Sequence, residues 1–291
     1  MGKLAMRKII RHLAAMIAVV LVGGLLSATL VRWAPGFDVD EEQLDAQLSA
    51  ESIQALRQAR ARDRDIVRFY LHYLGRACRG DLGESRTLNR PVRELLAERL
   101  PVTVRLVGAG LLAGWLCAVL LAVAATMARR AACNLAATLL GGIFLSLPAA
   151  VLALLFVFAS APAYLVIALV VFPKVFSYTR NLLAKSYGLP HLVTAYAKGL
   201  GPLRVLLWHV LPVTAAQLLA VAGISVSIAL GAAIPVEALC GVAGIGQLAW
   251  QAALGRDLPL LVNLTVLVTV ITLGANWGSE LAGQSFAGGG T

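Results

Sequence analysis

The stretch from Ala131 to Pro173, AACNLAATLLGGIFLSLPAAVLALLFVFASAPAYLVIALVVFP, contains no charged residue. A single helix over this stretch would be about twice as long as a bilayer is thick. Two membrane spans are therefore expected here, with Pro148 and Pro162 as the available breaks. The second of these spans has to be short or kinked. The stretch places the chain among the helical membrane proteins.

The composition of the whole chain predicts the same class. The 291 residues are 59% hydrophobic and 14% charged, whereas a soluble domain carries roughly 25% charged residues. A net charge of +10 would also suit a nucleic-acid-binding protein, but the basic residues are divided among segments beside apolar spans, which favours membrane topology. The four cysteines include no CxxC pair, so they indicate neither a metal site nor a disulfide framework.

Four further apolar stretches flank the first one. Leu13–Val31 follows a basic stretch, as the core of a signal peptide would, but it is long enough to span and no clear cleavage site follows it, so we interpret it as a retained first helix. Leu106–Ala128, Val205–Val236 and Leu258–Ser279 are the other three. Residues 238–255 are uncharged and Gly-rich, which indicates a re-entrant or surface segment.

The charges predict six spans with the N-terminus inside. This arrangement puts Arg129-Arg130 and the acid-free segment 174–204 inside, together with all five lysines. We expect a cytoplasmic N-terminus and first helix over 1–31, an extracytoplasmic region with a helical insertion over 32–105, and a transmembrane core over 106–291. Long loops such as 32–105 cross largely regardless of their charge. The predicted fold is thus an all-α, polytopic integral membrane protein.

Groups that would support chemistry inside the membrane are missing from the sequence. No Asp or Glu stands in the middle of a predicted span, and Glu237, Asp257 and Glu280 lie at predicted ends, which disfavours a proton or ion relay. The chain has no phosphate-binding loop, HExxH or GxSxG motif. We therefore expect no catalytic residue, metal site or cofactor, and no enzyme. Gly110-x-x-x-Gly114 permits close helix contact, but such spacing is common by chance.

The inner loop contains a short amphipathic helix. His191–Leu211 reads HLVTAYAKGLGPLRVLLWHVL, in which Leu192, Tyr196 and Leu200 recur every four residues and form one face. Gly201-Pro202 ends this helix, and the proline suits the first turn of the next one. A partner that gripped the short helix would tilt the attached span. An ordinary loop helix on lipid headgroups would show the same periodicity.

The same stretch resembles the cytoplasmic loop of permease subunits in binding-protein-dependent ABC importers. That loop has the form EAA, three residues, Gly, nine residues, Ile, one residue, Leu-Pro; here Val193-Thr194-Ala195 stands at the EAA positions and His209 at the isoleucine. The run TAYAKGL is most similar to the dipeptide, oligopeptide and nickel branch, where TARAKGL is typical. Because this loop docks on the ATP-hydrolysing subunit in the family, the resemblance implies that coupling involves Thr194, Ala195, Tyr196, Ala197, Lys198, Gly199, Leu200, Leu211 and Pro212.

Other segments resemble the same branch in the same order. They are Ala34-Pro35-Gly36, Gly80–Ser85, Pro91-Val92, Glu98–Pro101, Thr103 and Ser146-Leu147-Pro148. In the outer segment before the last span, the family motif is matched by Glu237, Gly244, Gly246 and Asp257. The chain departs from the family at Val193, which offers no carboxylate, in its short outer loop Ser160–Ala163, and at residues 59–65.

The resemblance implies a permease subunit, in the bacterial inner (plasma) membrane, of an importer for peptides or a related small solute. Its implied partners are a second permease subunit, most simply as a heterodimer, ATP-binding subunits at the cytoplasmic face, an extracytoplasmic solute-binding protein and membrane lipid, with no nucleic acid. Two alternatives stay open: a secondary carrier driven by an ion gradient, and a non-catalytic membrane assembly factor. The missing mid-span carboxylates count against the carrier.

Overall fold

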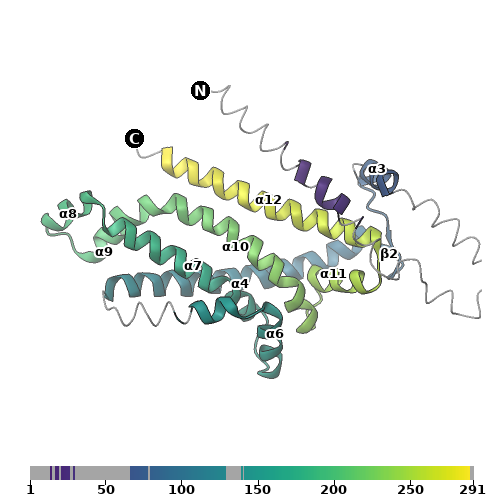
Figure 1. Cartoon of the computed structure of the whole chain (residues 1–291), viewed down its shortest axis with the longest axis horizontal. Coiled ribbons are helices and arrows are strands. Elements are labelled where there is room, and N and C mark those ends of the chain that lie inside the picture. Colours follow the sequence, from purple (N-terminus) through teal and green to yellow (C-terminus); the bar gives the residue numbers. More distant parts are fainter. Residues whose placement is uncertain are drawn as a thin grey trace, which may run out of the picture. The chain divides into compact units, whose positions relative to one another are not determined.

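The computed structural model describes residues 14, 17–19, 21–26, 29, 66–77, 79–128, 139 and 141–288, apart from a few side chains within the helices. These residues form helices and one short hairpin (Figure 1), in two compact units: residues 1–100 with 248–271 (unit 1), and residues 101–247 with 272–291 (unit 2). The elements are α3 Ile66–Ala77, β1 Glu84–Ser85, β2 Arg90–Pro91, α4 Val92–Ala128, α6 Ala149–Phe158, α7 Tyr164–Tyr187, α8 Pro190–Ala197, α9 Pro202–Val205, η2 Leu206–Val210, α10 Leu211–Leu239, α11 Ile245–Leu254 and α12 Leu258–Gly288.

The described residues include four helices that are long and apolar enough to cross a membrane: α4, α7, the run from α9 to α10, and α12. Two shorter apolar helices cover Ile17–Leu26 and Ala149–Phe158. The all-α, polytopic fold predicted from the sequence is confirmed. The count of six spans stays a prediction, because the Arg129-Arg130 pair, much of Leu13–Val31 and residues 32–65 of the expected helical insertion lie outside the described residues.

Helix α4 is longer than the predicted span Leu106–Ala128. It begins at Val92, continues as one helix of 37 residues to Ala128, and has Pro101 inside it. Proline removes the bond that its N–H would make to the carbonyl four residues earlier. Ala97, which carries that carbonyl, and Pro101 are both exposed. The freed carbonyl is thus on the surface, and the helix continues.

Helix α7 is longer than the expected span. It continues past Pro173 to Tyr187, so the expected inner loop 174–204 is helical up to residue 187. Val175, Thr179 and Leu183 are buried at four-residue spacing, which is the pattern of a helix face that packs against a neighbour. The charges of this segment therefore lie on the rest of the helix surface.

Small residues bring the helices of unit 2 together. Helix α10 packs against α7 and α6 (Figure 1). Where α4 meets α7, a Cβ atom at Gly110 would lie 2.5 Å from Cβ of Ile167, and one at Gly114 would lie 2.9 Å from the carbonyl oxygen of Ala168. Real Cβ atoms do not approach so closely, so both positions require glycine for this contact. The Gly110-x-x-x-Gly114 pair thus forms a helix contact, although its spacing alone predicted little.

Unit 1 has its own core and a hairpin. Tyr70 and Tyr73 of α3 pack with Leu258 and Val262 of α12, and Leu25 packs against this cluster. The Tyr73 hydroxyl donates to Oδ1 of Asn263, at 2.9 Å. Strands β1 and β2 pair antiparallel, with Glu84 opposite Pro91 and Ser85 opposite Arg90. The hairpin leads directly into α4.

Candidate functional site

The predicted loop helix is present as α8, with two buried positions on its packed side. Proline starts α8 at Pro190, and the last turn is followed by Gly199, whose φ of +74° lies in the left-handed region that favours glycine. Leu192 and Ala195 are buried, at 1% and 4% exposure. Lys198 is exposed. A helix with Leu192 on one face, followed by glycine, is as the sequence predicted, but α8 ends at Ala197, so Leu200, which was expected on that face, lies beyond the helix.

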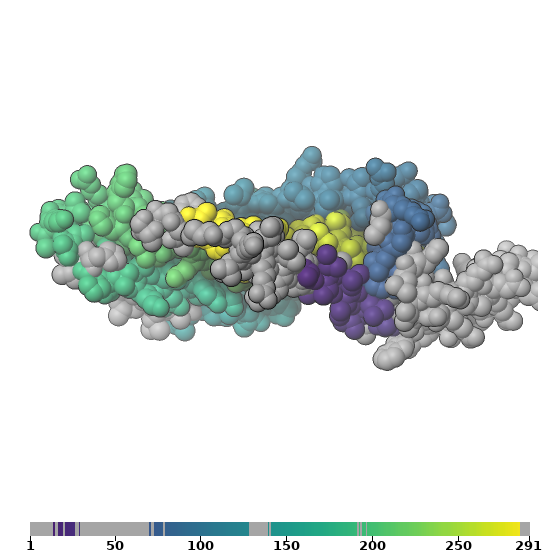
Figure 2. Space-filling view, turned by 90° about the horizontal axis from the view of Figure 1, so that it is seen from above, coloured from purple at the N-terminus to yellow at the C-terminus, as the bar shows by residue number. Residues whose placement is uncertain are grey.

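The coupling residues of the family resemblance lie partly on the surface and partly inside. Thr194, Ala197, Lys198 and Gly199 are exposed and Leu200 is half-buried. The side chain of Tyr196 lies outside the described residues. These exposed residues belong to the green surface at the left of the space-filling view (Figure 2). A partner protein could therefore contact the last turn of α8 and the residues that follow it.

The connection from α8 to the long helix α10 contains a feature that the sequence analysis missed. Gly201 is the N-cap of α9 and Pro202 stands in its first turn, as predicted. The next five residues, Leu206–Val210, form a π-helical turn before α10 begins. Leu211 and Pro212, the Leu-Pro of the family loop, are exposed in the first turn of α10. In the sequence, Pro212 was the available signal for this turn, because proline cannot make the backbone hydrogen bond of a regular helix.

At the far end of α10 lies a buried carboxylate, that of Glu237, whose side chain has no exposed surface. Its Oε1 accepts a hydrogen bond from the Thr103 hydroxyl of α4, at 2.6 Å. Its Oε2 accepts from the backbone N–H groups of Gly246 and Gln247, at 2.7 and 3.3 Å. Because these N–H groups open α11, the negative charge faces the positive end of that helix dipole. The carboxylate thus joins α4, α10 and the first turn of α11.

Two glycines of the predicted outer motif make room for this arrangement. A Cβ atom at Gly244 would collide with the Glu237 carboxylate, and one at Gly246 would lie 2.7 Å from Cα of Ile234. Thr103 also accepts a bond from the N–H of Ile245, at 2.8 Å. The structure therefore brings Glu237, Gly244 and Gly246 together. The role of Thr103, in contrast, was not predicted.

Asp257, the fourth residue of the outer motif, belongs to unit 1 and is fully buried there. Its Oδ1 accepts from the N–H of Leu260, at 3.1 Å, as an N-cap of α12 does. Its Oδ2 accepts from the Ser85 hydroxyl at 2.5 Å and from the N–H of Thr87 at 3.1 Å. Asp257 therefore fastens the β1–β2 hairpin to the start of α12.

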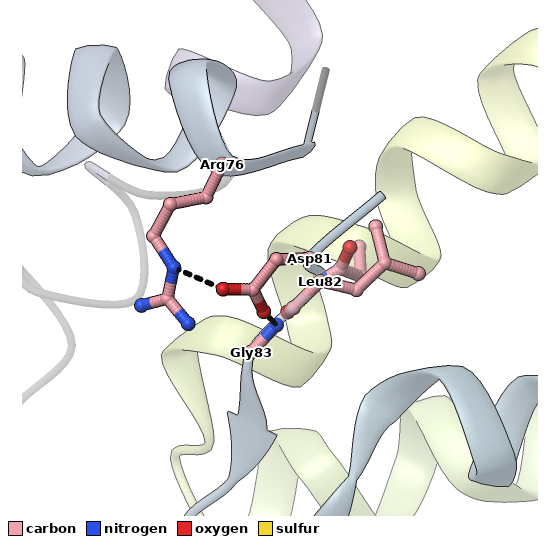
Figure 3. Close-up of polar contacts among 5 residues, drawn as sticks. Arg76, Asp81, Leu82 and Gly83 are labelled. Atoms are coloured by element: carbon pink, nitrogen blue, oxygen red, sulfur yellow. Dashed lines mark hydrogen bonds and ion pairs between the residues drawn. The ribbon is translucent and has the colours of Figure 1, made fainter. Parts of the chain in front are cut away.

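A second set of polar contacts holds the residues just before β1. Asp81 Oδ2 accepts from Arg76 Nε at 2.8 Å, and Asp81 Oδ1 accepts from the N–H of Gly83 at 2.9 Å (Figure 3). The bond from Arg76, then that from Gly83, holds the pKa of Asp81 below its ordinary value. Asn263 Nδ2 donates to the carbonyl of Leu82, at 2.9 Å. The residues before β1 are thus tied both to α3 and to α12.

None of these clusters has the composition of a catalytic or metal centre. Within the described ranges, no group of three His, Cys, Asp or Glu side chains is placed to hold a metal ion. Both buried carboxylates accept bonds from hydroxyl and backbone N–H groups, which is what a structural cap needs. The arrangement joins helices; it offers no nucleophile or general base to a reactant.

The chain is similar to known proteins in sequence and in fold. The family described as "Binding-protein-dependent transport system inner membrane component" matches residues 110–283. The dipeptide transport system permease protein DppB of Bacillus subtilis is 25% identical over 288 residues, which cover 92% of each chain. A chain of the MetNI methionine ABC transporter in an inward-facing conformation superposes with a TM-score of 0.60 at 16% identity, over 67% of this chain and 97% of that chain. This last likeness shows a shared fold. The family match extends over more than half of the residues, from α4 to α12, and the chain therefore belongs to the family of binding-protein-dependent transport system inner membrane components.

Proposed function

We propose that this chain is the permease subunit of an ATP-driven importer that receives peptides, or a related small solute, from an external binding protein. The observation that carries the proposal is the family match over residues 110–283, which includes α8 and the outer segment with Glu237. The dipeptide permease similar over 92% of its length supports peptides as the solute class. The MetNI transporter with the same fold is an ABC transporter.

The mechanism uses α8 as the contact with the motor. ATP-binding subunits at the cytoplasmic face bind the surface formed by Thr194, Ala197, Lys198 and Gly199. ATP binding and hydrolysis in those subunits favour one of two arrangements of the spans, and access switches between the two membrane sides. Such a switch requires only that the motor binds the two arrangements with different affinity. This chain makes and breaks no bond.

A second permease subunit completes the pathway, and the binding protein docks on the extracytoplasmic side. The N-terminus lies in the cytoplasm, and so do Lys198 and the rest of the loop from Gly188 to Gly201. Excess Lys and Arg in short loops favours this orientation. The exposed apolar surfaces of α4, α6 and α10 face lipid or the second permease.

Capture of the ATP-binding subunit tests the proposal, with two glycines as a matched pair. Gly199 and Gly201 are both exposed, and a Cβ atom at either would meet nothing within 4 Å, but only Gly199 has a positive φ. Gly199→Ala therefore costs about 1–2 kcal/mol in the observed turn, or about tenfold in binding. Tagged wild type and Gly201→Ala should co-purify an ATP-hydrolysing protein, identified by mass spectrometry, and Gly199→Ala should bring down much less.

Orientation and energy source give two further measurements. In a variant with the natural cysteines replaced, Lys198→Cys should react with a membrane-impermeant maleimide only from the cytoplasmic side. Reaction from outside would exclude contact with a cytoplasmic motor. Transport in vesicles that contain the chain without any ATP-binding subunit would instead support the secondary carrier.

A further inference from the structure

The π-helical turn between α9 and α10 is built by identifiable bonds. The N–H of Leu206 still bonds to the carbonyl of Pro202, four residues back, whereas the N–H of Leu211 bonds to the carbonyl of Leu206, five residues back. Val210, at the junction, has φ −88°, well away from the −63° of a regular helix. The helix therefore contains one residue more at this point than an α-helix would.

Pro212 gives the physical reason for the wide turn. In an unbroken α-helix, the nitrogen of residue 212 would bond to the carbonyl of Trp208, but proline has no N–H and its ring collides with that carbonyl. Opening the preceding turn relieves the collision. The buried Thr214 supports the altered turn, since its hydroxyl lies 3.1 Å from the carbonyl oxygens of both Val210 and Leu211, a contact that often bends helices.

The two sides of this turn have different surroundings. Leu206 and Val210 are buried, while Leu207 and Trp208 are 50% and 74% exposed. The turn contacts α7 as well as its neighbours α9 and α10. It is therefore packed on one side only, and a change in its helical pitch would not have to displace a core on the other side.

One polar group of the turn, the imidazole of His209, is incompletely satisfied. Among the described residues, two buried side-chain polar atoms have no hydrogen-bond partner: Nδ1 of His209, within the turn, and Oγ1 of Thr179, on α7. Buried polar atoms without partners are rare in native structures, and a reservoir of strain is one explanation for them. A second arrangement of the turn could satisfy them.

We propose that the Leu206–Val210 turn is the joint through which α8 and α9 move relative to α10. The inference rests on the proposed function, because a motor bound at α8 supplies the movement. Helix α10 behaves as a rod from Leu211 to Leu239, and the joint decides how far a displacement of α8 turns it. Converting the turn to a regular α-helix while keeping all its residues would rotate α8 and α9 by about 100° relative to α10.

Deletion of Trp208 tests the π-helical turn itself, apart from the side chains around it. In a variant that also carries Pro212→Ala, so that the proline ring no longer collides with a carbonyl, removing one residue turns the π turn into a regular α-helix without changing the direction of α8 and α9, and Leu206 and Val210 then stand three apart, still on one helix face. Trp208→Ala is the matched control, because it removes the same indole and keeps the residue count. Pro212→Ala is a second variant, which keeps every residue and permits the α-helical bond.

Three measurements are made on each variant, co-expressed with its ATP-binding subunit. The first is the amount of that subunit captured, and the second is ATP-dependent uptake of a peptide. The third is the distance between spin labels at Leu203 and Gln217, two exposed positions on either side of the joint in unit 2 and outside the motor-binding surface, with and without ATP under conditions that block hydrolysis. The natural cysteines are replaced by serine, and a label pair at Gln217 and Ile234, within α10, reports on the rod alone.

We expect the Leu203–Gln217 distance to change with ATP in wild type and in Trp208→Ala, and to stay constant in the Trp208 deletion. Capture by the deletion variant stays within about twofold of wild type, while ATP-dependent uptake falls about tenfold. Pro212→Ala also loses the distance change, and it captures less subunit because α8 is rotated. An unchanged distance response and full uptake in the deletion variant, or in Pro212→Ala if the deletion variant does not fold, would overturn the joint. Failure of wild type to capture any ATP-binding subunit would overturn the proposed function instead.

Discussion

Among the residues that the structure describes, two carboxylates are buried, Glu237 in unit 2 and Asp257 in unit 1. They accept the same kinds of hydrogen bond but hold different parts of the chain together. Each accepts one hydroxyl, from Thr103 or Ser85, and two backbone N–H groups. Asp257 caps the helix that begins at the next residue, which many polar residues can do. Glu237 stands nine residues before the N–H that it accepts from Gly246, at the end of another helix.

The two sites differ in which hydrogen-bond donors are exposed to water when a mutation removes the carboxylate. Two donors at each site are buried: Thr103 and Gly246 for Glu237, and Ser85 and Leu260 for Asp257. The third donor is the half-buried Gln247 at Glu237 but the exposed Thr87 at Asp257. Water can therefore satisfy one donor at the hairpin when Asp257 is lost, and it reaches the donors of Glu237 less easily. Glu237 should therefore contribute more to the stability of its unit, although the two sites have the same number of hydrogen bonds.

The largest effect is expected from Glu237→Ala. Three donors lose their acceptor, at about 1–3 kcal/mol for each that stays buried, so a loss of about 3–5 kcal/mol is expected. Asp257→Ala should cost about 2–3 kcal/mol, because two of its donors stay buried while the exposed N–H of Thr87 is hydrated. Thermal unfolding of the two variants in the same detergent measures the difference. Equal midpoints would mean that partner burial does not distinguish the sites.

A methyl group at Gly246 tests the geometry of the Glu237 site. Its Cβ atom would press on backbone atoms of Ala233 and Ile234, which cannot rotate away, so Gly246→Ala should cost about 1–3 kcal/mol. At the Asp257 site, Gly255→Ala meets only the side chain of Thr87, 2.6 Å from Oγ1, which can adopt another rotamer. Its unfolding midpoint should lie close to that of wild type, and an equally large decrease would contradict this explanation.

Amide substitutions sharpen the comparison further. Asp257→Asn keeps an oxygen for the N-cap bond from Leu260, but its NH₂ group cannot accept from Ser85 and Thr87. Because Thr87 is exposed to water, a loss of only about 1 kcal/mol is expected. Glu237→Gln keeps the shape but loses the charge that faces the start of α11, for which about 1–2 kcal/mol is expected in a buried setting. The same unfolding measurement in low-salt and high-salt buffer should give the same Glu237→Gln difference, because buried charges are little screened.

The smallest effect concerns a third carboxylate, Asp81, which is exposed and paired with Arg76 (Figure 3). The pKa of Asp81 is lower in the folded than in the unfolded protein. Its stabilising contribution is therefore complete above its ordinary pKa of 3.8 and is lost as the pH falls through the lower, folded value. Hydrogen exchange of the Gly83 N–H reports on this contact.

Wild type should protect the Gly83 amide better than Asp81→Asn at neutral pH, and the two proteins should converge as the pH falls through the lowered pKa of Asp81. Glu84→Gln, which changes an exposed carboxylate of the same hairpin, serves as the control and should follow wild type throughout. An exposed ion pair is worth little, so the unfolding midpoint of the whole protein should hardly move. A pH-independent difference would show that Asp81 does not act through its charge.

Hydrophobic periodicity and turn residues in the sequence predicted much of the fold. The class of the protein was predicted from its apolar stretches. The helix α8 was predicted from Leu192 at helical spacing and from the Gly201-Pro202 pair that comes after it. Helix ends were predicted less well, because polarity was taken to mark them. Lys174 and Arg180 suggested a loop, but helix α7 continues there with its apolar face packed. The span was predicted to begin after Pro101, at Leu106, but helix α4 begins before Pro101 and continues across it.

The candidate site shows the same division. The residues Glu237, Gly244, Gly246 and Asp257 were recognised from their resemblance to a family motif, without a role for any of them. Their partners Thr103 and Ser85 are 134 and 172 residues away in the chain. No local pattern can indicate such a pairing, since a serine or threonine has the same neighbours whether or not a distant carboxylate meets it.

By itself, the sequence determined that this chain is a helical membrane protein, where its loop helix lies and which family it resembles, because hydrophobic periodicity and proline and glycine act over a few residues. Only the tertiary structure decided that two carboxylates are buried as helix caps, that Gly110 and Gly114 form a contact, and that a π-helical turn precedes Pro212. These features depend on which groups from distant segments meet, and on where a helix can relieve a lost hydrogen bond.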